Sequence, residues 1–403
     1  MRISTNTMYD MGVAGMQQAT SDLIRTQQQV SSGRRILTPS DDPVASARVL
    51  DLTQSQSINK QYDTNTGSAT SSLGMEESTL ASVGNLIQSM QTTAVYAGNG
   101  TLNNSDRASL ATELRANYQE LLGLANNTDG NGQYLFSGYK GVTKPFVETS
   151  LGNVTYQGDQ GQRLIQISPS RQMAVSDSGS SVFQQIKNGN GTIVGAAAAA
   201  NTGAGIIDPA TVTNLADANL RQPVSIVFNN PPTTFSVTGT GTGNPVNVPY
   251  TSGSTISYNG WSMNITGAPQ PGDTFTVQPS SNVDIFKTLG DFIAQLETPI
   301  QGGGTGAAAK LTNNINTALQ NFGQSLQNVL TVRTSVGTRM NEVDSVKSAG
   351  EDLQLQYQQT ISSLQDMDYA QAITDLTRQK ASLEAAQLSF TKIQSLSLFN
   401  YIQ

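Results

Sequence analysis

The chain of 403 residues contains no cysteine and no histidine. Their absence excludes disulfides, cysteine nucleophiles, histidine general bases and zinc sites built from thiolate or imidazole ligands. Carboxylates, lysine, tyrosine and serine remain, so the set of residues that could support catalysis is small. Charged residues make up only 13% of the chain, and the net charge is −7. With no basic cluster in the sequence, nucleic acid and anionic membranes are unfavourable partners.

Long apolar runs are also missing, since none approaches the roughly 20 residues that span a bilayer. The first residues, MRISTNTMYDMG, lack the apolar segment of a cleaved secretory signal. We therefore expect a protein that stays in the cytosol or is exported by a route that reads another signal. At this length the chain can form roughly two to four domains with ample buried core.

Apolar residues at heptad spacing predict helices at both ends of the chain. From Val329 the pattern continues through Val336 and Val343 for more than five heptads, with faults at Arg339, Gly350 and Thr360. Its phase shifts after Asp368, and large apolar side chains then recur every seven residues. The terminal seams are Tyr9, Met16, Leu23 and Val30 at the N-terminal end, and Tyr369, Leu376, Leu383 and Phe390, with Ile393 beside them, at the C-terminal end.

The two terminal seams share one period and a similar length, which favours packing of the two ends against each other. The alternative is two unrelated amphipathic helices, each lying on its own domain. The apolar pattern also continues through Leu396 and Phe399, where most chains fray and turn polar. Heptad seams are more often intramolecular core than partner surface, but this terminal placement favours a partner surface.

The middle of the chain has a different pattern, in which apolar residues alternate by two from about Gly130 onward. Asn259-Gly260 separates two such runs, and this pair suits a type I′ hairpin turn. The Ala/Gly-rich stretch at 195–205 reads as a linker or loop. We expect the α+β class: a long antiparallel helical bundle or coiled coil formed by the paired N- and C-terminal regions, with a β-rich outer domain inserted between them.

These changes of pattern predict three domains. Residues 1–42 and 368–403 form a terminal coiled-coil domain, and residues 43–175 and 283–367 form a helical core domain with small β-elements. Residues 176–282 form the β-rich outer domain. Because the helical patterns close on each other across the outer domain, we expect that domain to be dispensable for the fold of the rest.

The charged residues between the first two helical patterns could form a site. Asp41 and Asp42 could bind a metal or act as an acid/base pair. Beside Pro43 and a helix start, capping is the favoured interpretation. Arg34 and Arg35 could pair with the acidic groups of a partner or remain solvated, and the sequence leaves both possibilities open.

A second motif, Gly304–Leu311, nearly matches a phosphate-binding P-loop. Ala309 stands where the second glycine is needed, and Leu311 replaces the serine or threonine that binds Mg²⁺. We interpret this segment as an ordinary loop. The sequence therefore predicts no catalytic residue, no cofactor and no metal site.

The segment SSGRRILTPSDDPVASAR resembles the N-terminal signature of the flagellin family. The segments GQYLFSGYKGVTKPF and YAQAITDLTRQKASLEAAQLSFTKIQSLSLFNYI are similar to later parts of that family, so the resemblance covers roughly the first 150 and last 120 residues. The Asp-Asp-Pro and Tyr-Leu-Phe-Ser-Gly sequences resemble the subunit of the hook–filament junction more than filament flagellin. Residues 176–282 carry no such signature.

The resemblance implies a non-enzymatic structural subunit of the bacterial flagellum that joins the hook to the flagellin filament. The implied partners are further copies in a ring of about eleven subunits, the first hook-associated protein on the hook side, flagellin on the filament side and a cytoplasmic export chaperone. The implied location is extracellular, reached by type III export without a cleaved signal peptide. The paired terminal helices would form the inner tube, and the outer domain would face outward.

On this interpretation, the assembly surface consists of the two seams, the charged turn and the apolar end. We expect about 1–34 and 368–403 to be largely disordered in the free monomer, because short isolated helices are marginal in water. The candidate interface residues are Tyr9, Met16, Leu23, Val30, Arg34, Asp41, Asp42, Tyr369, Leu376, Leu383, Phe390, Ile393, Leu396 and Phe399.

Three other functions remain as alternatives. Filament flagellin shares both ends of the resemblance, and long polymers formed by the purified protein alone would favour it. A secreted adhesin with a coiled-coil stalk and a β head would have one helical end and a membrane anchor. An enzyme housed in the outer domain is the weakest alternative, because residues 176–282 contain few carboxylates and no histidine.

Overall fold

The computed structural model describes residues 5–239, 243–300 and 304–395 of the chain. The chain divides into two compact units. The terminal unit comprises the described residues of Met1–Thr64 and Val346–Gln403, and the central unit comprises those of Asn65–Ser345. None of the helices in the described ranges is both long and apolar enough to cross a membrane.

The helices begin and end where the sequence supplies caps and breakers. Gly33, with φ of +72°, follows the last residue of the first helix, a conformation that glycine adopts without strain. Asn103 and Asp106 form a reciprocal capping box at the start of the third helix. The α-helices in the described residues are α1 (Thr5–Ser32), α2 (Pro43–Ala97), α3 (Asn104–Ala125), α4 (Ile285–Glu297), α5 (Gly304–Gln365) and α6 (Tyr369–Ser395).

The largest β-structure of the central unit consists of two antiparallel sheets. One has the strand order β11-β10-β9-β14-β6, and the other has the order β12-β13-β7, with β8 also paired to β13. Their strands are β6 (Ile193–Ala197), β7 (Ile206–Ile207), β8 (Thr211–Val212), β9 (Val224–Phe228), β10 (Thr234–Gly239), β11 (Val248–Pro249), β12 (Thr255–Tyr258), β13 (Trp261–Thr266) and β14 (Thr274–Pro279).

Three short antiparallel pairs and one π-helical turn complete the central unit. The pairs join β1 to β2, β3 to β4 and β5 to β15. The elements are β1 (Phe146–Ser150), β2 (Asn153–Tyr156), β3 (Leu164–Ser168), β4 (Arg171–Ala174), the π-helical turn η1 (Ser180–Gln184), β5 (Ile186–Lys187) and β15 (Asn282–Val283).

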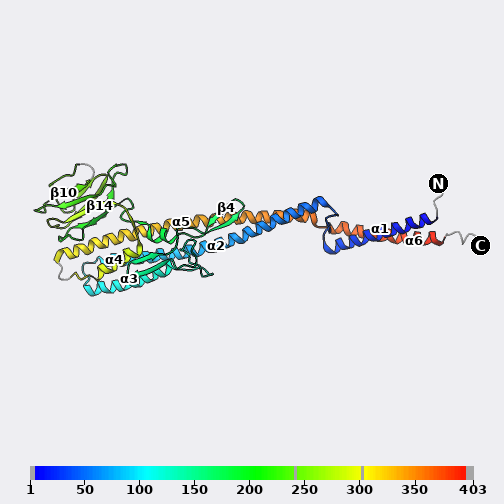
Figure 1. The fold of residues 1–403 in the computed structure, drawn as a ribbon, viewed down its shortest axis with the longest axis horizontal. Coiled ribbons are helices and arrows are strands. Elements are labelled where there is room, and N and C mark those ends of the chain that lie inside the picture. The colour runs from blue at the N-terminus through cyan, green and yellow to red at the C-terminus, as the bar shows by residue number, and fades with distance from the viewer. Residues whose placement is uncertain (1–4, 240–242, 301–303, 396–403) are drawn as a thin grey trace, which may run out of the picture. The chain divides into compact units, whose positions relative to one another are not determined.

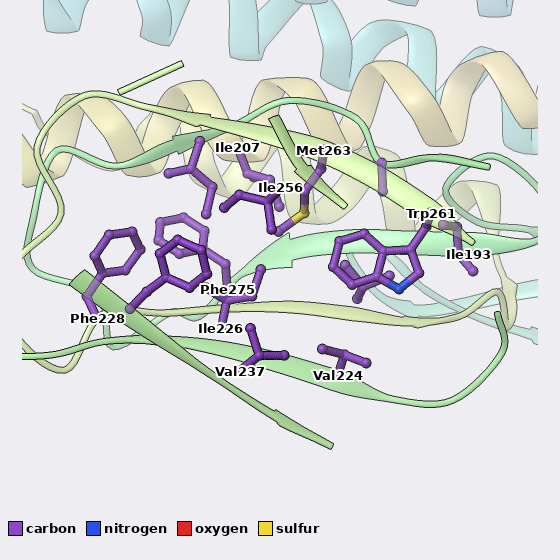
Figure 2. Packing of buried hydrophobic residues seen from close by; sticks show 14 of the residues in the cluster. Ile193, Ile207, Val224, Ile226, Phe228, Val237, Ile256, Trp261, Met263 and Phe275 are labelled. Carbon is purple, nitrogen blue, oxygen red and sulfur yellow. The ribbon is translucent and has the colours of Figure 1, made fainter. Parts of the chain in front are cut away.

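The two larger sheets enclose an apolar core, whose side chains gather between the strands in Figure 2. Trp261 and Phe275 are both fully buried in this core. The predicted hairpin is confirmed, because Asn259 and Gly260 join β12 to β13 with positive φ angles of 44° and 73°, as a type I′ turn requires. The α+β class with paired helical ends and a β-rich middle is likewise confirmed.

Two segments expected to be loops have regular structure. The Ala/Gly-rich stretch contributes β6, which pairs with β14. Its small residues permit close packing, since a Cβ on Gly195 would lie 3.2 Å from Cδ1 of Ile207. The segment Gly304–Leu311 forms the first turns of α5, where consecutive alanines favour the helix.

A cluster of buried aromatic rings in the central unit is built from η1, β1, α4 and the segment that carries Phe136. The ring of Phe183, from η1, lies 5.3 Å from that of Phe136 and 5.4 Å from that of Phe146. Phe146 in turn lies 5.4 Å from Phe286 of α4. All four side chains are fully buried, so the segment that carries Phe183 belongs to the core of the helical part.

The chain enters and leaves the larger β-structure through the β5–β15 pair. Lys187 lies opposite Asn282, and the amide of Asn188 donates to the carbonyl of Ser281 at 3.0 Å. The structure therefore argues for a narrower replaceable insert, residues 189–280, than the predicted outer domain of 176–282. The three-domain division itself stays a prediction.

Replacing residues 189–280 by a short Gly/Ser linker is expected to leave a soluble protein with its helices intact, because the flanking backbones are already hydrogen-bonded. Replacing residues 176–282 also removes Phe183. Loss of a buried phenylalanine costs about 3–5 kcal/mol. Circular dichroism and thermal unfolding of the two variants distinguish these outcomes, and aggregation of the shorter deletion would refute the narrower boundary.

Candidate assembly surface

The terminal unit contains two antiparallel helices, α1 and α6, that lie side by side (Figure 1). At one end, the rings of Tyr9 and Phe390 are 5.1 Å apart. Gly12 faces the same ring, because a Cβ at this position would lie 3.0 Å from Cδ2 of Phe390. At the other end, a Cβ on Gly33 would lie 2.7 Å from the hydroxyl of Tyr369. The helices that carry the two predicted terminal seams therefore pack against each other.

The seam between α1 and α6 buries its apolar side chains only in part. The half-buried members are Met16, Leu23, Val30, Leu376, Leu383 and Phe390. Among the described residues of the terminal unit, the buried ones are Thr26, Ile36, Ala45 and Ala372, of which only Ile36 carries a large apolar side chain. Full burial of a large apolar side chain stabilises a protein by about 1.5–3 kcal/mol. The two helices gain little of this stabilisation, because they bury so few such side chains.

Other large apolar side chains on α1 and α6 face solvent. Tyr9 and Tyr369, both in the predicted seams, are 49% and 54% exposed. Outside the seams, Ile24 and Ile373 are about half exposed, and Leu388 is 67% exposed. These exposed apolar side chains are distributed along the helix pair, and the described residues leave them accessible to another protein.

Two chain turns meet at the end of this helix pair. The amide of Arg35 donates to the carbonyl of Gln365 at 2.8 Å, and the amide of Met367 donates to the carbonyl of Gly33 at 3.0 Å. The guanidinium of Arg35 also donates to the carbonyl of Leu364 at 2.8 Å. These bonds join the α1–α2 turn to the α5–α6 turn.

Asp41 organises the first turn. Its carboxylate accepts hydrogen bonds from the amides of Thr38 and Leu37, each at 2.9 Å, and lies 2.7 Å from the guanidinium of Arg25. The hydrogen bond from Thr38, that from Leu37 and the charge of Arg25 hold the pKa of Asp41 below its ordinary value. The carboxylate is therefore ionised at neutral pH and has a structural role in this geometry.

Asp42 caps α2, as the sequence predicts. Its Oδ1 accepts from the amide of Ala45, the third helical residue, at 3.0 Å. The guanidinium of Arg35 lies 3.5 Å from the other carboxylate oxygen, and both side chains are partly exposed. An exposed ion pair of this kind adds little stability.

Asp42→Ala is expected to cost about 0.5–2 kcal/mol of unfolding free energy, because the cap is lost. Asp42→Asn should cost little, since the amide oxygen can accept the same hydrogen bond. Denaturant unfolding of the two variants measures both effects. An asparagine variant as unstable as the alanine variant would show that the charge contact with Arg35 matters more than the cap.

The remaining candidate residues are placed as follows. The side chain of Arg34 is exposed and pairs with no carboxylate in the described part of the chain. Ile393 belongs to α6, but its side chain lies outside the described ones. Leu396 and Phe399 lie outside the described residues. The sequence did not reveal the ion pair of Arg25 with Asp41, because residues in an i, i+16 relation meet only once the turn has formed.

A groove of about 410 Å³ lies between α1, the α1–α2 turn and α6. Acidic, amide and guanidinium groups line it, including Asp22, Gln29 and Asp375. Within the described ranges, no group of three or more acidic side chains could hold a metal ion. The groove therefore offers hydrogen-bond donors and acceptors and charges of both signs.

Comparison with known proteins relates the chain to components of the bacterial flagellum. Residues 3–141 match the family described as the bacterial flagellin N-terminal helical region. Over 401 residues, 99% of each sequence, the chain is 31% identical to flagellar hook-associated protein 3 of Salmonella typhimurium and 32% identical to that of Escherichia coli. It is also similar to a crystal structure of the flagellar junction protein FlgL from Legionella pneumophila, with 31% identity, a TM-score of 0.69 and coverage of 79% of this chain and 100% of that one.

Proposed function

The chain belongs to the family of flagellar hook-associated protein 3, and from this premise we propose that it forms the layer of subunits that connects the hook to the flagellin filament. As a member of this family, the protein is a structural component of the flagellar junction. The observation that carries the finer proposal is the terminal unit, where large apolar side chains of α1 and α6 remain half-buried or exposed in a single chain.

In the proposed assembly, copies of the chain form a ring in which α1 and α6 pack against the same helices of neighbouring copies. Neighbours would cover Ile24, Ile373 and Leu388, which no part of the described chain buries. Ordering the helices costs about 1–2 kcal/mol of conformational entropy per residue. Each large apolar side chain that becomes fully buried returns about 1.5–3 kcal/mol, so the cost can be offset only when neighbouring copies add contact area. Assembly and helix pairing are therefore coupled.

The two sides of the ring would contact different partners, the first hook-associated protein on one side and flagellin on the other. Export by the flagellar type III route, with a cytoplasmic chaperone, fits terminal regions that fold only at their destination. A narrow channel passes an unfolded chain, and the absence of cysteine leaves no disulfide to obstruct it. Load would pass through the ring by side-chain packing, without a chemical step.

Deleting the gene and imaging the cells tests the proposal. We expect hooks without filaments, flagellin shed into the medium and loss of swimming, all restored by the intact gene. Normal filaments in the deletion strain would overturn a junction role.

Filament flagellin remains a second candidate, because the match to the flagellin N-terminal region extends over residues 3–141. Electron microscopy of the purified protein separates the two functions. Long filaments formed by this chain alone would indicate flagellin, whereas short or no polymers are expected of a junction subunit.

A further inference from the structure

Three charged side chains meet inside the central unit. Glu76 comes from α2, Arg339 comes from α5, and Asp177 lies in the segment between β4 and η1. Glu76 is 1% exposed and Asp177 is 8% exposed. Arg339 occupies a position where the heptad pattern calls for an apolar residue, so the cluster explains that fault in the seam.

Glu76 holds the backbone of the segment. Its Oε1 accepts a hydrogen bond from the amide of Asp177 at 3.0 Å. Its Oε2 is buried and has no hydrogen-bond partner among the described residues. An ionised carboxylate normally accepts several hydrogen bonds, and a buried one without them is costly. This half-satisfied site therefore suits a neutral carboxylic acid better than a carboxylate.

Asp177 has the stronger set of partners. Its carboxylate accepts from Nε2 of Gln162 at 2.6 Å and forms an ion pair with the guanidinium of Arg339. The same guanidinium donates to the carbonyl of Ala174 at 3.1 Å. The positive charge of Arg339 is thus committed to Asp177 and to the backbone of its segment.

The cluster therefore contains two buried carboxyl groups and one guanidinium. The next nearest arginine along α5, Arg333, is paired with Glu77 at 2.6 Å. Arg171 of β4 is paired with Glu342 of α5. Arg163, the neighbour of Gln162, lies 4.0 Å from Asp129. Because these cations are engaged elsewhere, only one of the two carboxyl groups in the cluster has a counterion among the described residues. Burial, and then the negative charge of Asp177, raise the pKa of Glu76 to about 8, while Arg339 opposes the shift.

We propose that Glu76 acts as a proton-controlled latch, whose neutral carboxyl holds the segment Ala174–Gly179 against α2 and whose ionisation in alkaline surroundings releases that segment. The ionised group could still accept the hydrogen bond from Asp177. It would then place a second negative charge in a buried site that has one counterion. The released segment leads directly into η1, which carries Phe183 of the aromatic core.

The latch predicts the direction in which stability depends on pH. The pKa of Glu76 is higher in the folded chain than its ordinary value of 4.5, so between those values the folded state binds more protons than the unfolded state. The stabilisation is complete below the ordinary value and is lost as the pH rises towards about 8. Glu76→Gln, which stays neutral and keeps an oxygen to accept from Asp177, removes this dependence.

Thermal unfolding of the full chain between about pH 5 and about pH 9 tests the latch. The transition temperature of the central unit should fall with rising pH in the unsubstituted protein and should change much less in Glu76→Gln. Glu77→Gln is the matched control, because the neighbouring carboxylate is paired with Arg333 near the surface, and this variant should keep the full pH dependence. Equal pH dependence in Glu76→Gln and the unsubstituted protein would overturn the proposal.

A second measurement does not depend on any variant being folded. The carboxyl carbon of Glu76 can be followed by nuclear magnetic resonance in protein labelled with ¹³C at its glutamates. The latch requires that the carboxyl group of Glu76 titrates well above the ordinary range of a glutamate. It also requires that the amide of Asp177 exchanges faster once Glu76 is ionised, after the exchange rate has been corrected for the intrinsic effect of pH. Titration of Glu76 near 4.5 would show that no latch exists.

Discussion

Leu383→Asp is expected to abolish assembly of the protein at the junction while leaving the unfolding of the central unit unchanged. Leu383 lies in the middle of α6, half-buried beside α1, and the proposed ring would bury it further. The substitution removes about 1.5–3 kcal/mol of apolar burial in each subunit. It also places an unpaired carboxylate in an apolar seam, at a further cost of several kcal/mol. Each subunit of a ring would carry the defect, so the loss should be complete.

Complementation of a deletion strain measures this effect. Cells that express Leu383→Asp should have hooks without filaments, although the protein is made and exported. Leu383→Met is the matched control, since it conserves volume and apolar character and should restore filaments. Normal filaments with the aspartate variant would contradict an assembly role for the seam. A lowered transition temperature of the central unit would point instead to a general folding defect.

Short-range patterns in the sequence predicted much of this fold. The seven-residue spacing located α1, α5 and α6, and Asn259-Gly260 located the β12–β13 hairpin, because both signals depend on neighbouring residues. The long seam of α5 is confirmed in part by Val336 and Val343, which are fully buried at two of its predicted positions.

One fault in the seam has a partner that lies far away in the sequence. Arg339 breaks the heptad where its guanidinium pairs with Asp177. No contact of Gly350 explains the glycine, because its hydrogen bond with the side chain of Asn59, at 2.7 Å, uses a backbone carbonyl that any residue supplies. A sequence pattern shows that the period fails at these positions. It cannot show which distant residue supplies the partner, since that choice depends on the tertiary fold.

The candidate surface was predictable to a similar degree. The cap formed by Asp42 follows from Pro43 and the helix start, and is confirmed. Other features depend on how α1 and α6 are rotated about their axes. They include the contact of Tyr369 with Gly33 and the exposure of Ile373 and Leu388. Heptad spacing leaves that rotation undetermined wherever a helix has more than one apolar stripe.

The second large effect concerns the free monomer, in which we expect the described residues of about 1–34 and 368–403 to lack stable structure. The terminal unit buries one large apolar side chain, Ile36, among its described residues, whereas the central unit has buried cores of its own. Helices that cannot bury an apolar face are marginal in water, and most helical stability in proteins comes from packing. The helix pair of α1 and α6 should therefore form only when neighbouring copies cover it.

Amide hydrogen exchange on the purified monomer and on the assembled ring tests this central claim most directly. The amides of α4, which lie in the buried core of the central unit, serve as the internal reference and should be protected in both states. Residues 376–393 should exchange at nearly the rate of an unfolded chain in the monomer and become strongly protected in the ring. Strong protection of residues 376–393 in the monomer, without any partner, would contradict the proposal that these helices pair on assembly.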